Sequence, residues 1–331
     1  MPANLPPPYH EAERRWRAAK TPGEQLAALE EMLRLMPKHK GTDHLQADIK
    51  ARIAKLRKEP QKGGPKRTNV FVVDKEGAGQ VALAGAPNTG KSALLAGLTK
   101  ARPEVADYPH TTREPMPGMM PFEDVSFQLV DLPPLSRDYT EPALFDVFRR
   151  AELLWLVVSG RDPLDDLELA ESLLAEKKIA PVPVGDYRDE SAVPGMLARP
   201  TLLVATGLDL PGARGNLEAF AELTGRRWTV EAVSTVSREG LDALARRTFA
   251  AFAQAFGMFR VYAKEPGKPP DKSAPFILTR GDTVADLAGI IHGDLRERVK
   301  NAKIWGSGAF DGQVVPREHP LVEGDVVQLN L

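Results

Sequence analysis

The chain has 331 residues, of which 42% are hydrophobic and 27% charged, a length and composition sufficient for two or three compact domains. It has 44 Lys plus Arg against 45 Asp plus Glu, so any attraction to nucleic acid must come from a local basic patch. The absence of cysteine excludes disulfides and thiolate metal sites. No apolar run approaches the roughly 20 residues needed to span a bilayer, and the N-terminus lacks the apolar segment of a signal peptide. We expect a cytoplasmic protein with no membrane partner.

Residues 1–68 are expected to form a helical N-terminal arm with a basic linker. A capping box with proline at the first helical position, Thr21–Glu24, precedes apolar residues at helical spacing. A second helix is predicted over 43–58. Ten Lys or Arg and three acidic residues lie between Lys38 and Arg67. This excess of positive charge fits either a solvated helix face with a flexible tail or a contact with the phosphate backbone of RNA.

Residues 69–258 alternate apolar strands with helices, which predicts an α/β domain with a mostly parallel sheet and helices on both faces. The predicted strands are 81–84, 125–130, 153–158, 201–205 and 228–233, and the predicted helices are 91–98, 165–177, 216–223 and 241–256. The proline-rich stretch 180–200 is expected to be a loop insertion. From residue 259, two strands, a helix over 283–299 and further strands predict a small mixed β-grasp module.

The clearest motif is GAPNTGKS at residues 85–92, which matches G-x-x-x-x-G-K-S and stands between a predicted strand and a predicted helix. In such a loop, backbone N–H groups and the helix N-terminus bind phosphates, the Lys neutralises their charge and the Ser gives an oxygen to Mg²⁺. The expected phosphate-binding residues are Gly85, Ala86, Pro87, Asn88, Thr89, Gly90, Lys91, Ser92 and Ala93.

Two further segments supply oxygen ligands. Asp131 directly follows a predicted strand, where P-loop enzymes place the Asp on the magnesium side, although an Asp at a strand end is otherwise a common turn residue. The segment 108–112, YPHTT, carries hydroxyls that can reach Mg²⁺ and the γ-phosphate; alone, it would be an ordinary Thr-containing turn.

The segments GAPNTGKSALLAGLT, VADYPHTT and LVDLPPL together resemble the Obg and DRG branch of GTPases, and the chain after residue 259 resembles their TGS domain. The resemblance covers about 78–331. It implies a P-loop GTPase domain over 69–258 and a β-grasp TGS domain over 259–331. It also implies GTP and GDP as ligands and Mg²⁺ held by Ser92, Thr112 and Asp131, with Lys91, Thr112 and Asp131 as catalytic residues. Its implied partners are the ribosome or RNA, and a protein regulator is compatible with it.

The guanine-binding motif N-K-x-D of the family reads Thr206, Gly207, Leu208, Asp209 in this chain. Asp209 remains to pair with the donors of guanine, whereas the Lys that packs on the base is missing. The other interpretation of Asp209 is a turn or helix cap. Ser234 and Thr235 resemble the remaining base-binding loop.

A second departure affects hydrolysis. The family's D-x-P-G has Pro134 in place of its glycine, so the N–H that approaches the γ-phosphate is absent. Leu135 stands where many GTPases have the Gln that orients water. Members of this kind use a backbone arrangement or K⁺, and Asn88 either helps to hold that cation or braces the loop.

Three functions remain open on these grounds. The first is a Mg²⁺-dependent GTP-binding protein with slow hydrolysis that acts on the ribosome or RNA through its basic arm and TGS domain. The second is a degenerate G domain that serves as a nucleotide-stabilised binding scaffold with little or no turnover. The third is an ATPase.

Overall fold

The computed structural model describes residues 7–18, 22–36, 46, 49–50, 52–53, 73–101, 114–137, 141–308 and 310–331. The chain forms two compact units, Met1–Val70 and Phe71–Leu331. Within the described ranges, no helix combines the length and apolar character that crossing a membrane requires.

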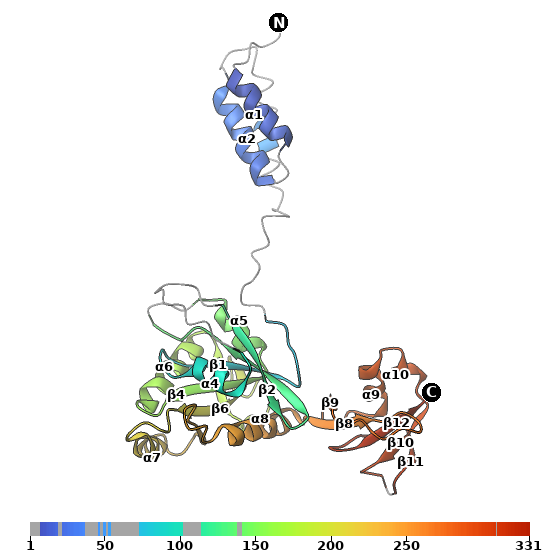
Figure 1. The fold of residues 1–331 in the computed structure, drawn as a ribbon. Coiled ribbons are helices and arrows are strands. Elements are labelled where there is room, and N and C mark those ends of the chain that lie inside the picture. Colours follow the sequence, from blue (N-terminus) through green and yellow to red (C-terminus); the bar gives the residue numbers. More distant parts are fainter. Residues whose placement is uncertain are drawn as a thin grey trace. The chain divides into compact units, whose positions relative to one another are not determined.

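The N-terminal unit contains helix α1 (Pro7–Ala18) and helix α2 (Pro22–Leu35), drawn in blue in Figure 1. Helix α2 begins at the proline of the predicted capping box. The buried side chains of this unit form a small core of its own: Tyr9, Ala12, Leu29, Met32, Met36, Ile49 and Ile53. Arg15 of α1 forms an ion pair with Glu31 of α2 at 2.9 Å. Most of the predicted helix 43–58 and of the basic stretch 38–67 lies outside the described residues.

The second unit is built on a seven-stranded sheet in the order β2-β3-β1-β4-β6-β5, with β7 also paired to β6. Its strands are β1 (Gln80–Ala84), β2 (Met116–Phe122), β3 (Val125–Asp131), β4 (Leu153–Ser159), β5 (Ile179–Pro183), β6 (Leu197–Thr206) and β7 (Val230–Ala232). All pairs are parallel except β2 with β3. The predicted mostly parallel sheet is therefore confirmed.

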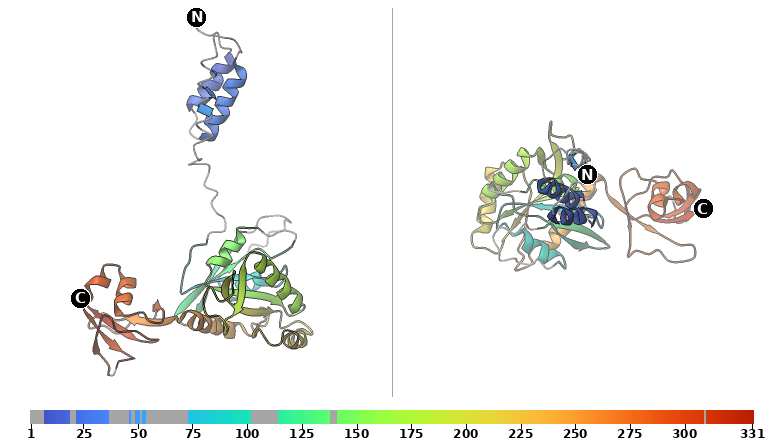
Figure 2. Two further views of the ribbon diagram at one scale, coloured as in Figure 1. Left: turned by 180° about the vertical axis from the view of Figure 1, so that it is seen from behind. Right: turned by 90° about the horizontal axis from the view of Figure 1, so that it is seen from above.

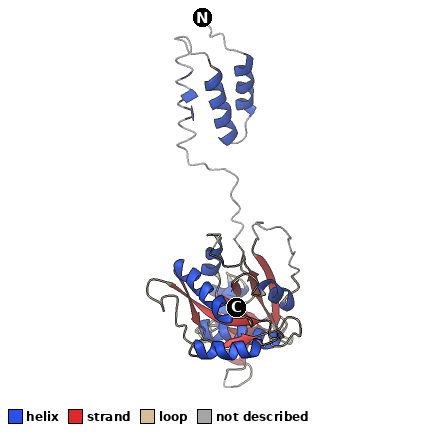
Figure 3. Cartoon of the chain, turned by 90° about the vertical axis from the view of Figure 1, so that its left-hand side faces the viewer, coloured by secondary structure: helices blue, strands red, loops and turns tan. Residues whose placement is uncertain are grey.

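Helices cover both faces of this sheet, as Figures 1 and 2 show from opposite sides. Helices α5 (Leu144–Arg150), α6 (Pro163–Glu176) and α7 (Ala213–Leu223) contribute buried apolar residues to the core on one face. Helices α4 (Lys91–Leu98) and α8 (Leu241–Phe256) contribute to the core on the other. In Figure 3, the strands in red accordingly lie among helices in blue.

The stretch 180–200, expected to be a loop, is partly a strand. β5 pairs in parallel with the N-terminal half of β6 in the register Ile179 to Leu197. Val184 N–H donates to the Thr201 carbonyl at 3.3 Å, so the alternation of the strand turns the nitrogens of Pro181 and Pro183 away from β6. Proline at these two positions removes no bond of the ladder, which is why a proline-rich segment forms a strand here.

The C-terminal part of this unit holds a five-stranded sheet in the order β11-β10-β12-β8-β9. Its strands are β8 (Phe259–Ala263), β9 (Phe276–Leu278), β10 (Asn301–Trp305), β11 (Gln313–Pro316) and β12 (Val326–Asn330). The predicted single helix 283–299 is wrong, because the structure has two helices, α9 (Val284–Ile291) and α10 (Leu295–Arg298). His292 is extended and, with Gly293, separates them. Thr283 and Asp286 form a capping box at the start of α9.

Candidate nucleotide site

The phosphate loop connects β1 to α4. Two of its glycines are required by the fold. A Cβ on Gly85 would lie 2.3 Å from the Val157 carbonyl oxygen of β4, and Gly90 has a φ of 82°, a left-handed conformation that side chains disfavour. The loop therefore passes close to the sheet before it turns into the first turn of α4, where free N–H groups bind anions.

Lys91 curls back over this loop. Its ammonium donates to the Gly85 and Ala86 carbonyls, each at 3.0 Å, and the side chain is buried. The Thr89 hydroxyl also donates to the Ala86 carbonyl at 3.0 Å. The loop thus holds a positive charge inside its own curve, which is the arrangement that neutralises bound phosphates.

Ser92 and Asp131 meet beside the loop. The Ser92 hydroxyl donates to Asp131 Oδ2 at 2.5 Å, and Asp131 is the last residue of β3. Mg²⁺ takes oxygen ligands and is usually bound by one or two protein side chains together with phosphate oxygens. A hydroxyl and a carboxylate in contact at the mouth of a phosphate loop fit this preference, so Ser92 and Asp131 are suitable to hold the ion.

The chain after Asp131 is tied to the phosphate loop. Leu135 N–H donates to the Gly85 carbonyl at 3.0 Å, and the Leu135 side chain is fully buried in the core with α5. Pro134 next to it is half-buried. Position 135 therefore turns its side chain into the core and offers nothing to a water molecule beside the phosphates. The sequence showed the change from Gln to Leu but gave no sign of this backbone bond.

The predicted base-binding residues lie on two loops, one after β6 and one after β7. Ser234, fully buried, donates its hydroxyl to Asp209 Oδ1 at 2.5 Å, and Leu208 N–H donates to the Val233 carbonyl at 3.1 Å. Gly207 has a φ of 72°. These bonds fix the Asp209 carboxylate at the carboxyl end of the sheet, where ligands of open α/β sheets bind.

Thr206 links the loop after β6 to the phosphate loop. Its hydroxyl donates to the Thr89 carbonyl at 2.6 Å, across 117 residues of sequence. The sequence places Thr206 at the first position of the base-binding motif and assigns its side chain no role. The structure shows it as a positioning residue that holds the base-binding loop against the phosphate loop, a bond that the sequence does not predict.

Other predicted residues are placed as follows. Pro87 and Asn88 are exposed, and Asn88 has a φ of 63°, a conformation that Asn tolerates better than most residues. Ala93 is exposed in the first turn of α4. Thr235 is half-buried and packs near Gly97 of α4. Thr112 lies outside the described residues.

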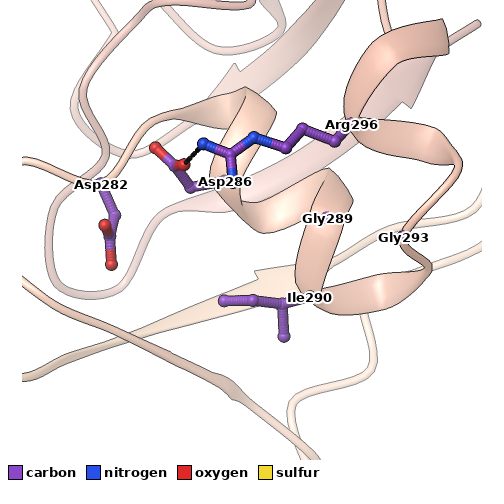
Figure 4. A pocket seen from close by; sticks show the side chains of 6 residues that line it. All are labelled: Asp282, Asp286, Gly289, Ile290, Gly293 and Arg296. Atoms are coloured by element: carbon purple, nitrogen blue, oxygen red, sulfur yellow. Dashed lines mark hydrogen bonds and ion pairs between the residues drawn. The ribbon is translucent and has the colours of Figure 1, made fainter.

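A separate hollow of about 440 Å³ lies in the C-terminal sheet domain, beside α9 and α10. Figure 4 shows Arg296 reaching across it to Asp286, a contact of 2.7 Å. Asp286 also accepts hydrogen bonds from the Thr283 backbone N–H and hydroxyl. These two bonds lower the pKa of the Asp286 carboxyl, and the charge of Arg296 adds to the effect. Asp282 accepts from the Thr279 backbone and hydroxyl. The carboxylates of Asp282 and Asp286 thus form hydrogen bonds or ion pairs within the protein. The residues that line the hollow include none of the phosphate loop.

Two family models match the chain, one within the part built on the seven-stranded sheet and one over the five-stranded sheet. The family model described as 50S ribosome-binding GTPase matches residues 80–184, and the TGS domain model matches residues 259–330. GTP-binding protein 1 of Schizosaccharomyces pombe is 27% identical over 365 residues, which span 92% of this chain and 98% of that protein. Developmentally-regulated G-protein 1 of Arabidopsis thaliana is also 27% identical, over 92% of this chain and 90% of that protein.

The chain combines a GTPase domain with a TGS domain and resembles the Obg and DRG GTPases. A third relative, GTPase Obg of Desulforudis audaxviator, is 38% identical over 180 residues, or 51% of this chain and 39% of that protein. The seven-stranded sheet with its helices is the G domain, and the five-stranded sheet is the TGS domain. The resemblance found in the sequence is confirmed.

Proposed function

We propose that the chain binds GTP and GDP together with Mg²⁺ and hydrolyses GTP slowly. The observation that carries the proposal is the Ser92–Asp131 contact of 2.5 Å beside a loop that holds the Lys91 ammonium. Lys91 would neutralise the outer phosphates, and Ser92, Asp131 and Thr112 would hold Mg²⁺. The ion would supply additional positive charge to the transferring phosphoryl group.

Guanine is the base that the second loop fits best. The Asp209 carboxylate, held by Ser234, is an acceptor for the N1 and N2 donors of guanine, and adenine offers no such donor pair. The GTP-binding relatives support the same choice. We therefore favour a GTPase over an ATPase, with Thr206, Asp209, Ser234 and Thr235 forming the base site.

Slow turnover follows from the segment after Asp131. Pro134 has no N–H to offer to the γ-phosphate, and Leu135 is buried in the core. Since neither residue orients water, catalysis would depend on K⁺ beside Asn88 or on a group from a regulator. These same two features support the alternative function, a scaffold that binds nucleotide with little or no turnover.

Ribosome or RNA is the proposed partner in the cytoplasm. The family model that matches the G domain is described as ribosome-binding, and the basic stretch 38–67 offers charge to phosphates. In this proposal, residues 1–68 form the arm, 69–258 the G domain and 259–331 the TGS domain. Co-sedimentation with ribosomes over a series of salt concentrations, with and without residues 1–67, tests the contribution of the arm.

Single-turnover GTP hydrolysis by the full chain tests the enzymatic proposal. We expect a slow, Mg²⁺-dependent release of phosphate, and GDP should displace a fluorescent nucleotide at lower concentration than ADP. GTP binding without any release of phosphate would favour the scaffold. Stronger displacement by ADP would favour an ATPase.

A further inference from the structure

Two exposed apolar side chains stand beside the base loop. Leu210 directly follows Asp209 and is 37% exposed, and Val236 directly follows Thr235 and is 80% exposed. Among the described residues of the G domain, only Leu223 is another large hydrophobic residue with comparable exposure. Exposed apolar residues that occur singly need no explanation, whereas these two follow residues of two loops that are joined by the Asp209–Ser234 hydrogen bond.

The same hydrogen-bond cluster holds both residues in place. The Ser234 hydroxyl donates to Asp209 and accepts from Val236 N–H at 3.2 Å. Leu210 N–H donates to the Gly207 carbonyl at 2.9 Å, which closes a tight turn around Asp209. Leu210 and Val236 are therefore fixed on the two loops that meet at the Asp209–Ser234 contact.

Leu210 also takes the space of the missing Lys. A Cβ on Gly207 would lie 2.9 Å from Leu210 Cδ1, so the Leu210 side chain folds over the position where the family pattern has its base-packing Lys. The φ of 72° at Gly207 leaves this approach open without strain.

We propose that Leu210 and Val236 form an apolar clamp for the purine ring of the bound nucleotide and replace the stem of the missing Lys. The inference rests on the proposed function, because it needs a nucleotide in this site. The faces of a purine are apolar and polarisable, and the Asp209 carboxylate, held by Ser234, is available to bind the polar edge. The clamp contacts the ring faces alone, so it raises affinity for every purine nucleotide, and Asp209 alone selects the base.

The test compares Leu210→Ser and Val236→Ser with exposed controls in the full chain. Affinity for GDP, XDP and inorganic tripolyphosphate is measured by displacement of a fluorescent guanine nucleotide. We expect each substitution to weaken GDP and XDP by a similar factor, about five- to tenfold, because the ring would cover each apolar side chain only in part. Tripolyphosphate, which has no base, should bind as before. The controls Leu223→Ser and Val314→Ser, at 72% and 56% exposure, should change nothing.

A second experiment asks whether a substitution can restore the affinity for GDP. Gly207→Lys in the Leu210→Ser background replaces the apolar clamp by the Lys stem of the family pattern, and the serine removes the side chain that a Cβ at 207 would meet. We expect this double variant to recover most of the lost GDP affinity, despite the strain of a side chain at positive φ.

The outcomes separate the clamp from the proposed function. If the unmodified chain binds neither GDP nor GTP, the proposed function fails and the clamp with it. If the unmodified chain binds GDP and both serine variants match the Leu223→Ser control, the clamp is overturned and the nucleotide site stands. A parallel loss of tripolyphosphate affinity would show a disturbed phosphate loop and also overturn the clamp.

Discussion

Arg260 of β8 donates to Asp124, in the turn between β2 and β3, at 2.7 Å. The guanidinium also pairs with Glu123 at 2.6 Å and with Glu323 at 2.7 Å, and it lies 4.7 Å from the ring centre of Phe249 in α8. One side chain of the TGS domain therefore contacts the hairpin whose second strand ends at Asp131. The G domain and the TGS domain are therefore joined by a cluster of ion pairs as well as by the chain itself.

Arg260→Leu should destabilise the protein by about 3 kcal/mol, because it leaves the Asp124 carboxylate without its cation while only 16% of that side chain is exposed. Thermal unfolding of Arg260→Leu, Asp124→Leu and the double variant forms a double-mutant cycle. The double variant should lose less than the sum of the two single variants. Additive losses would show that the two groups do not interact.

Tyr262→Phe tests the same junction through its pH dependence. Burial and the hydrogen bond from the Tyr262 hydroxyl to Asp124, at 2.5 Å, raise the pKa of this phenol to about 12. The raised pKa means that the protonated phenol stabilises the fold fully below pH 10, and that this contribution is lost as the pH rises from 10 through 12. The melting temperature of the wild type should exceed that of Tyr262→Phe at pH 8, and the difference should shrink by pH 11. A constant difference would contradict the assignment.

Lys91→Ala should abolish detectable binding of GTP while the fold persists. The substitution removes the counter-charge to the phosphates and the two bonds that the ammonium makes within the loop. Binding of a fluorescent GTP analogue is the measurement, and circular dichroism checks the fold. Lys100→Ala, at an exposed lysine just after α4, is the control and should bind normally. Equal affinity in both variants would remove the phosphate-site assignment.

Ser92→Ala and Asp131→Asn should remove most of the Mg²⁺ dependence of GTP binding. Partners of metal ligands change metal affinity by 10- to 100-fold, so loss of a ligand itself should weaken the Mg²⁺ effect by about 100-fold. Mg²⁺ titration of GTP affinity measures this directly. Ser126→Ala, at the opposite end of β3, should keep the wild-type response. A normal Mg²⁺ response in both site variants would place the ion elsewhere.

Hydrolysis should be faster in K⁺ than in Na⁺, and loss of the Asn88 amide should erase the difference. The left-handed φ of 63° at Asn88 means that Asn88→Ala also adds backbone strain, so Asn88→Gly is needed beside it. Both variants should turn over GTP at the same rate in the two salts at matched ionic strength. A K⁺ advantage that survives in Asn88→Gly would assign the amide to bracing the loop instead.

The parts of the fold that the sequence predicts best have local signals at both ends. Helix α8 has its predicted limits, 241–256, since glycines with left-handed φ, Gly240 and Gly257, flank its apolar pattern. Strand β2 was not predicted because its sequence, MPGMMPF, contains residues typical of turns. It is a strand only through its pairing with β3, a contact that no local pattern contains.

In the candidate site too, features with a local sequence pattern are predicted and contacts between distant segments are not. The phosphate loop and Asp131 were predicted because consecutive residues carry the chemistry at fixed spacing. The bonds that join the loops were not predicted: Thr206 to Thr89, and Leu135 to Gly85. Each depends on a backbone group, which every residue possesses, so the sequence holds no distinguishing signal for it.

The two prolines of β5 affect how copies of this protein can meet. Edge strands with free N–H groups invite other chains to extend the sheet, which is a common route to aggregation. Pro181 and Pro183 stand where β5 would present its donors to a neighbour, and proline has none. A strand laid along this edge would find carbonyl acceptors but no donors at those two positions. The prolines therefore disfavour pairing of another chain with β5. This edge strand widens the sheet of the G domain without offering a full set of donors to a second copy.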